Sequence, residues 1–294
     1  MKRGDTMKKI LALTLALVLA LSLCACGGGN ADTTTTDNGD AADTATVEIP
    51  PVEDLTGTDT SAIPGVEDGV LTVGMECTYA PYNWTQTDDS NGAVPIVNNP
   101  GSYANGYDVM IAQRICDTYG WKLEVQAIEW DGLIPALNAG TIDAVIAGQS
   151  MTTSRMEQVD MAGPYFYASI VCVAKKDSEQ AKAKGISELT GTCTAQSGTI
   201  WYTDCLPQVE GAQIMAQSES APAMIMAVES GTVDFICTDM PTAMGAAAQD
   251  DNLVILNFSG TPGDFQFASE AERAENVNIG ISVRKGNTVL KDAI

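Results

Sequence analysis

The sequence predicts an α/β protein of two similar lobes, each a mainly parallel sheet flanked by helices. The first observation is a repeat, because residues 136–148 (ALNAGTIDAVIAG) return as residues 227–239 (AVESGTVDFICTD). Both copies contain a helix end, a Gly-Thr turn, an Asp and a short apolar strand. The second observation is a β-α-β-α-β order around each copy, which requires parallel strands joined by crossover helices. A third is a pair of β-type runs that connect the halves as two hinge strands.

The first lobe is expected over residues 69–168. Asp108 can cap a helix that runs to Tyr119, and Asp131 can cap a second helix that ends at Gly140. A loop rich in Asn, Gly and Pro is expected over 85–106. The strands of this lobe are predicted at 70–75, 123–128 and 142–147.

The second lobe, expected over residues 169–277, repeats this plan. Thr199 or a neighbour opens one helix, and a second helix covers 221–230. Its strands are predicted at 191–196, 213–217 and 233–238, and the crossing strands at 167–174 and 278–283. Residues 278–294 return to the first lobe. The chain stops in what resembles the opening turns of a helix, so we expect the first lobe to continue beyond Ile294.

The composition excludes several classes of function. The chain has 38 acidic and 15 basic residues, a net charge of −23, and no histidine. Nucleic-acid binding is excluded, because it needs clustered Lys and Arg against phosphates. The commonest general base and the commonest metal ligand are absent, so no metal and no cofactor are expected.

The N-terminus has the pattern of an export signal. Lys8 and Lys9 precede a 16-residue apolar run, which is short for a spanning helix and fits a signal peptide over 1–25. Leu23 to Gly27 resembles a bacterial lipoprotein signal, which would make Cys26 the lipidated residue. The alternative is an ordinary cleaved signal. Residues 26–68 are predicted to form a disordered acidic tether.

Six cysteines follow Cys26, and none of them forms a CxxC pair. Cys172 and Cys237 lie inside apolar runs, which predicts small buried thiols. No disulfide pairing follows from the sequence.

Polar residues gather just after the two repeated strands, where ligands bind in open α/β sheets. Gly148 ends the first copy, and Ser150 and Arg155 follow it. Asp239 ends the second copy. An Arg can bind a carboxylate through two N–H groups, and an Asp can accept from an ammonium group. A surface ion pair is the alternative for Arg155, and a helix N-cap the alternative or additional role for Asp239.

Four segments carry a resemblance to a known family, and Gly163-Pro164-Tyr165 follows them. They are 74–82 (GMECTYAPY), 105–109 (NGYDV), 129–137 (EWDGLIPAL) and 147–155 (AGQSMTTSR). Over residues 69–294 the chain resembles the family 3 solute-binding proteins, the extracellular amino-acid receptors of ABC importers. The resemblance implies a type II periplasmic-binding-protein fold.

The resemblance also implies roles for the site residues. It assigns Arg155 and Ser150 to the α-carboxylate of an amino acid, and Asp239 with the Gly148 carbonyl to the ammonium group. Thr199 would contribute a hydroxyl or N–H from the second lobe, and its alternative is a simple helix cap.

The side-chain pocket that the resemblance implies contains Tyr79, Trp130 and Glu76. The two rings would sandwich the ligand's side chain, and core packing is their alternative. A carboxylate at Glu76 favours a polar or cationic side chain, to which the rings could add cation–π attraction. Gln149 and Gln196 are weaker candidates for lining this pocket.

We therefore expect a monomeric, lipid-anchored receptor on the extracellular face of a bacterial membrane. It would deliver an amino acid to an ABC permease and perform no chemistry. One alternative is a dehydratase-like enzyme that uses Glu76 or Asp239 as an acid or base. Another is the ligand-sensing domain of a receptor.

Overall fold

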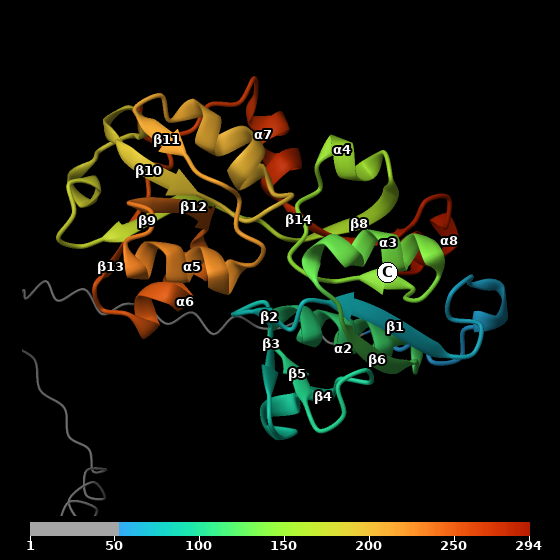
Figure 1. The fold of residues 1–294 in the computed structure, drawn as a ribbon. Coiled ribbons are helices and arrows are strands. Elements are labelled where there is room, and N and C mark those ends of the chain that lie inside the picture. The colour runs from blue at the N-terminus through green and yellow to red at the C-terminus, as the bar shows by residue number, and fades with distance from the viewer. Residues whose placement is uncertain (1–52) are drawn as a thin grey trace, which may run out of the picture. The chain divides into compact units, whose positions relative to one another are not determined.

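Two five-stranded sheets organise the fold, and the computed structural model describes residues 53–294. The first sheet has the order β6-β1-β7-β14-β8 and the second β11-β10-β12-β9-β13 (Figure 1). The first sheet contains β1 (Val70–Met75), β6 (Lys122–Ala127), β7 (Ala144–Val145), β8 (Val159–Phe166) and β14 (Ile279–Arg284). The second contains β9 (Ile170–Lys175), β10 (Gly191–Thr194), β11 (Ala212–Ile214), β12 (Phe235–Asp239) and β13 (Leu253–Leu256).

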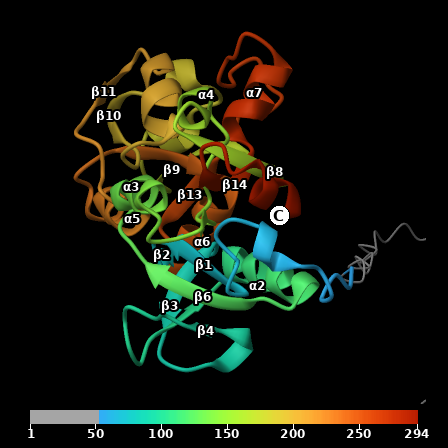
Figure 2. The same cartoon turned by 90° about the vertical axis from the view of Figure 1, so that its right-hand side faces the viewer.

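Both sheets have the same pairing pattern. β1 pairs in parallel with β6 and β7, as β10 does with β11 and β12. β14 and β9 each run antiparallel to both of their neighbours. β14 and β8 lie side by side in Figures 1 and 2. These two antiparallel strands are the predicted crossing strands, so the remaining strands of each sheet share one direction.

Helices connect the strands. The helices are α2 (Tyr107–Tyr119), α3 (Leu133–Ala139), α4 (Thr153–Met156), α5 (Ala221–Ser230), α6 (Met240–Gln249), α7 (Glu270–Val277) and α8 (Thr288–Ala293). Short 3-10 turns cover Thr60–Ala62, Ser90–Gly92, Trp130–Gly132, Gln180–Lys182, Ile186–Glu188 and Leu206–Gln208, and a π-helical turn covers Trp201–Cys205. None of the helices within residues 53–294 is long and apolar enough to cross a membrane.

The segment expected to be a loop over 85–106 contributes instead to a small antiparallel sheet, so that expectation was wrong. Its order is β2-β3-β5-β4. Its strands are β2 (Thr78–Tyr79), β3 (Asn83–Gln86), β4 (Val94–Pro95) and β5 (Tyr103–Asn105). The Asn, Gly and Pro residues mark the turns between strands that are too short to show a period in the sequence.

Two predicted helix starts differ from the structure. Gly106 is the N-cap of α2, whereas Asp108 lies inside its first turn with a buried side chain. Asp131 lies in the 3-10 turn before α3 and caps nothing. The helix expected to open at Thr199 or a neighbour is the π-helical turn, which has Ile200 as its N-cap. Asp is common both at N-caps and in first turns, so sequence alone does not separate the two.

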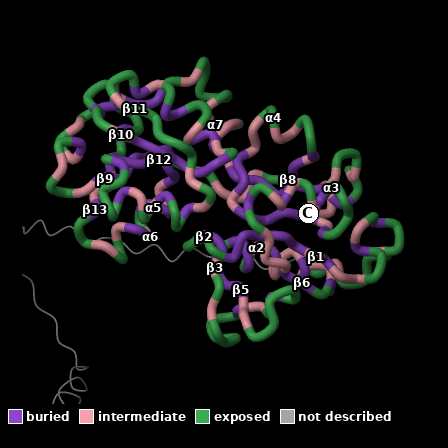
Figure 3. Tube along the Cα trace, viewed as in Figure 1, coloured by how far each residue is buried: buried purple, intermediate pink, exposed green. Residues whose placement is uncertain are grey.

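Each large sheet has its own hydrophobic core, and Figure 3 shows that its strands are mostly buried. The core of the first sheet includes Ile63 and Val66, which are 7% and 0% exposed. The predicted tether over 26–68 is therefore too long at its C-terminal end, because two apolar side chains suffice to dock a segment on an existing core. The predicted signal peptide, Cys26 and the tether up to residue 52 lie outside the described residues.

All six cysteines from Cys77 onwards are buried and free. Cys237 faces Cys172 across the β12–β9 pair. The prediction of small buried thiols at these two positions is confirmed, and burial raises the pKa of the Cys237 thiol.

Candidate functional site

The two copies of the repeat have the same local structure. Asp143 accepts a hydrogen bond from the N–H of Thr72 at 3.1 Å, and Asp234 accepts one from the N–H of Thr192 at 2.7 Å. These bonds tie β7 to β1 and β12 to β10 in the same way. The segments that follow β7 and β12 consequently leave equivalent edges of the two sheets.

Gly148 lies in the loop that follows β7. Its φ is +64°, and a Cβ placed on it would lie 2.7 Å from Tyr79 Cε1. Only glycine avoids both the strained backbone and the clash. The Gly148 N–H donates to the hydroxyl oxygen of Tyr165 at 3.2 Å, and this bond holds the Gly148 backbone in place.

Arg155 lies on α4, where the Thr152 side chain caps the helix. Its guanidinium donates to the main-chain carbonyls of Ser150 and Gly198, and it lies 5.5 Å over the Trp130 ring. Among residues 53–294, no carboxylate lies within 4.0 Å of this guanidinium. Burial lowers the pKa of Arg155 to about 10, so it stays charged at neutral pH. A half-buried cation without a carboxylate is suited to an anionic ligand.

Asp239 is fully buried and caps α6. It accepts from the Thr242 N–H and hydroxyl, both at 2.9 Å, from the Tyr79 hydroxyl at 2.5 Å and from the Tyr82 hydroxyl at 3.3 Å. The N-cap role is confirmed. The two tyrosines come from the first lobe and pack with the core of the second sheet, so this carboxylate joins the lobes.

Glu76 follows the end of β1 and is 6% exposed. Its Oε1 accepts from Gln196 Nε2 at 3.2 Å across the lobes, whereas its buried Oε2 has no hydrogen-bond partner within the part of the chain that the structure describes. Burial raises the pKa of Glu76 to about 7, with the Gln196 bond opposing the rise and nearby acidic residues adding to it. A buried carboxylate oxygen without a hydrogen bond has an unfavourable desolvation free energy. A hydrogen-bond donor of a ligand at this position would offset it.

These residues surround a cavity of about 10 Å³ between the lobes. Its walls are Tyr79, Trp130, Gly148, Ser150, Arg155, Gln196, Thr199 and Trp201. A larger cleft of about 690 Å³ shares Trp130, Arg155 and Thr199 with this cavity as lining residues. The structure thus brings six of the predicted site residues together.

Glu76 and Asp239 do not line the cavity. Each contacts a residue that does, Glu76 through Gln196 and Asp239 through Tyr79. The Thr199 hydroxyl donates its single hydrogen to the Gln196 carbonyl at 2.7 Å, so this hydrogen is not available to a ligand. The Tyr79 ring stacks on Tyr82 with ring centroids 4.9 Å apart. Tyr79 and Trp130 both line the cavity.

The sequence offers Gln196 only as a weaker candidate and does not point to Trp201, Tyr82 or Thr242 as site residues. Gln196 follows β10, the counterpart of β1, as Glu76 follows β1, and that equivalence was the available signal. Thr242 lies three residues after Asp239, the spacing of a helix cap. For Tyr82 the sequence gives no signal, because its partner Asp239 is 157 residues away.

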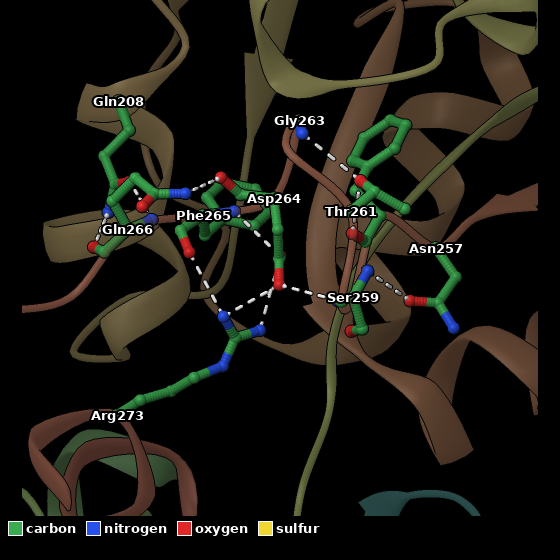
Figure 4. Close-up of polar contacts among 11 residues, drawn as sticks. Gln208, Asn257, Ser259, Thr261, Gly263, Asp264, Phe265, Gln266 and Arg273 are labelled. Atoms are coloured by element: carbon green, nitrogen blue, oxygen red, sulfur yellow. Dashed lines mark hydrogen bonds and ion pairs between the residues drawn. The ribbon is translucent and has the colours of Figure 1, made fainter. Parts of the chain in front are cut away.

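A separate hollow of about 450 Å³ lies around Arg273 of α7. Figure 4 shows that its guanidinium contacts Asp264, with an ion pair at 2.8 Å, and donates to the Phe265 carbonyl at 3.1 Å. This cation is neutralised within its own lobe. It therefore lacks the free donors that distinguish Arg155.

The chain matches a known family along most of its length. Residues 71–294 match the model of bacterial extracellular solute-binding proteins, family 3. The L-cystine-binding protein TcyA of Bacillus subtilis is 27% identical over 230 residues, which are 77% of this chain and 74% of that protein.

Solved structures of amino-acid-binding proteins share the fold. The arginine-bound form of truncated ArgBP from T. maritima has a TM-score of 0.60 and 27% identity, over 77% of this chain and 93% of that one. The ancestral amino acid-binding protein AncCDT-1, a precursor of cyclohexadienyl dehydratase, has a TM-score of 0.61 and 26% identity, over 78% and 87%. The predicted two-lobed α/β fold is confirmed.

Proposed function

Since the chain belongs to family 3 of the bacterial extracellular solute-binding proteins, we propose that it captures a polar or cationic L-amino acid between its lobes. It then delivers this ligand to the permease of an ABC importer. The proposal depends most on one observation. At a single inter-lobe site, the Arg155 guanidinium lacks a carboxylate and the buried Oε2 of Glu76 lacks a donor.

Each charged end of an amino acid has a matching group at this site. Arg155 and Ser150 bind the α-carboxylate, and Asp239 with the Gly148 carbonyl binds the ammonium group. Glu76 accepts from the ligand's side chain, which lies between Tyr79 and Trp130, and Thr199 completes the wall from the second lobe. The named ligands of the similar proteins, cystine and arginine, both carry a polar or charged group at their far end.

Binding requires the lobes to separate. The cavity of about 10 Å³ has room for about one water molecule. The Tyr79 hydroxyl occupies the Asp239 oxygen that an ammonium group would need. Opening at the two crossing strands would enlarge the cavity and release the Asp239 oxygen from Tyr79. When the lobes close around the ligand, its ammonium group would take the place of the Tyr79 hydroxyl at Asp239.

Titration calorimetry of the purified protein against the standard L-amino acids and L-cystine tests the proposal. We expect at least one ligand with a Kd well below 1 mM, and no binding tighter than about 1 mM would refute it. Arg155→Ala should weaken that ligand more than about 100-fold, because charge-assisted hydrogen bonds are each worth about 1.5–3 kcal/mol. Arg273→Ala is the matched control and should leave the affinity unchanged.

The protein is proposed to bind without turnover. The second candidate, a dehydratase-like enzyme, is favoured by the pKa of about 7 at Glu76, which suits a general acid. Mass spectrometry of the ligand after incubation separates the two. An unchanged ligand supports binding alone, and a product lighter by one water supports the enzyme.

Anchoring is also proposed. Residues 1–25 would be the signal peptide, Cys26 the lipidated residue, and the chain a monomer on the extracellular face of the membrane. Cys26→Ala should release the protein into the medium. A protein that stays in the membrane fraction after this change would contradict lipid anchoring.

A further inference from the structure

A buried carboxylate outside the cavity is joined to both binding loops of the first lobe. Asp108, in the first turn of α2, is 0% exposed. Its Oδ1 accepts from the Tyr165 hydroxyl at 2.6 Å, and its Oδ2 accepts from Asn83 Nδ2 at 2.8 Å. Neither contact caps the helix or belongs to the roles proposed above. Burying a carboxylate whose hydrogen-bond donors are all neutral costs free energy. We therefore asked what Asp108 contributes to the protein in return.

The charge on Asp108 fixes the direction of every hydrogen bond in the network. An ionised carboxylate only accepts, so the single hydroxyl hydrogen of Tyr165 points to Asp108. The Tyr165 oxygen is then free to accept the Gly148 N–H at 3.2 Å. Likewise the Asn83 amide turns its NH₂ to Asp108, and its Oδ1 accepts the Cys77 N–H at 2.7 Å.

The two N–H groups at the ends of this network belong to unusual backbone positions. Gly148 has φ +64° and Cys77 has φ +57°, the left-handed region that non-glycine residues rarely adopt. Cys77 directly follows Glu76, and Gly148 borders the cavity. A hydrogen bond at each position holds the loop in the conformation that aims these groups.

The network also reaches the hinge. Tyr165 lies near the end of β8, from which the chain crosses to the second sheet. The Tyr107 hydroxyl, one residue before Asp108, donates to the Tyr165 carbonyl at 3.1 Å. The binding loops are thereby fixed relative to the end of β8 as well as to each other.

We propose that Asp108 is a positioning residue that holds both first-lobe binding loops, through Tyr165 to Gly148 and through Asn83 to Cys77. The inference rests on the proposed function, since it concerns the affinity of that same site. Loss of the charge leaves Tyr165 and Asn83 free to reorient, and both N–H groups then lose a fixed acceptor.

Amide hydrogen exchange in the full chain without ligand tests the network itself. Asp108→Asn should speed exchange about tenfold or more at both Gly148 and Cys77, as expected for one lost hydrogen bond. The milder variant Tyr165→Phe should do so at Gly148 alone. Asp117→Asn on the same helix and Tyr119→Phe in the same lobe are the matched controls, and neither should alter either site.

Calorimetry with L-arginine, L-histidine and L-cystine tests the consequence. Asp108→Asn should weaken the tightest of these about ten- to a hundredfold. The double variant with Tyr165→Phe should weaken it no further than about the larger single effect, since both act through one network.

Unchanged exchange at Gly148 and Cys77 in Asp108→Asn would overturn the proposal, as would an equal rise throughout the first sheet. Faster exchange at both sites with an unchanged Kd would also overturn it. If neither these three ligands nor any other standard L-amino acid binds the unaltered protein, the proposed function fails, while the exchange result still decides whether the network exists.

Discussion

The loop at Gly148 and the helix start at Asp239 end two segments that are alike in backbone and that lead to side chains of opposite charge, Arg155 and Asp239. α3 and α5 both end on a left-handed glycine, with φ of 76° at Gly140 and 77° at Gly231. The following Asp binds the neighbouring strand in both. Beyond that point one copy leads to Arg155 and the other stops at a carboxylate. Repeating a backbone places ligand groups at equivalent sheet edges and leaves the side chains free to differ.

The carboxylates of the two lobes differ in a second way. Asp239 accepts four hydrogen bonds at 3.3 Å or less, whereas Glu76 accepts one and leaves Oε2 without a partner. The Asp239 carboxylate connects the two lobes through Tyr79 and Tyr82. The Glu76 carboxylate has an unfavourable desolvation free energy, which a hydrogen-bond donor of a ligand would offset. Substitutions at both carboxylates and at the two repeated turns test this difference.

The largest expected effect is the pH dependence of Glu76. A pKa raised from 4.5 to about 7 corresponds to about 3 kcal/mol. Because the folded pKa is the higher one, this stability is present below about pH 4.5 and is lost as the pH rises through about 7. Glu76→Gln should therefore be stabilised relative to the unaltered protein at pH 8 but not at pH 4.5, as measured by urea unfolding without ligand.

The exposed Glu157→Gln is the control for that series, and its stability difference should stay flat with pH within about 0.5 kcal/mol. A flat difference for Glu76→Gln as well would mean that Glu76 is ionised at little cost. The contrast between the two carboxylates would then disappear.

Asp239→Asn should weaken ligand binding about 30-fold, because it removes the charge that we propose to face the ammonium group. Ser269→Ala removes the N-cap of α7 in the same lobe and serves as the control. It should lower the stability by about 1 kcal/mol and leave the Kd unchanged. Equal Kd values for both variants would show that Asp239 acts only as a cap.

Gly148→Ala and Gly140→Ala separate the binding loop from the shared turn. Both place a Cβ at positive φ, which costs about 1–2 kcal/mol. The Gly148 Cβ additionally meets Tyr79 Cε1 at 2.7 Å, while the nearest atom to the Gly140 Cβ is 3.8 Å away. We expect Gly148→Ala to be about 1 kcal/mol less stable than Gly140→Ala in thermal unfolding. Equal melting temperatures would mean that Tyr79 moves aside freely.

The smallest effect tests the likeness of the copies. Asp143→Asn weakens one bond to a neighbouring strand and Asp234→Asn weakens two, and each change should cost about 1 kcal/mol. Asp143 also lies 3.5 Å from Arg284, which adds little for a partly exposed pair. Costs in urea unfolding that differ by more than about 1 kcal/mol would show that the two turns are not equivalent.

Local patterns along the chain predict the repeat, the two-lobed fold and six of the eight residues that line the cavity. The repeat is visible because Gly140, Asp143 and their counterparts are local requirements of a helix end and a strand start. Gly148, Ser150 and Arg155 follow from their places after a strand. Periodicity and turn chemistry act over a few residues, and a sequence displays them directly.

The hydrogen-bond partners of the polar groups depend on the tertiary structure. It moved Asp108 from an expected cap into a buried network, used the Thr199 hydroxyl on Gln196, and set Tyr79 against Asp239, 160 residues away. The energy of a buried donor or acceptor depends on which group faces it. Which groups face each other across two lobes is fixed by how the sheets meet, and no local pattern encodes that.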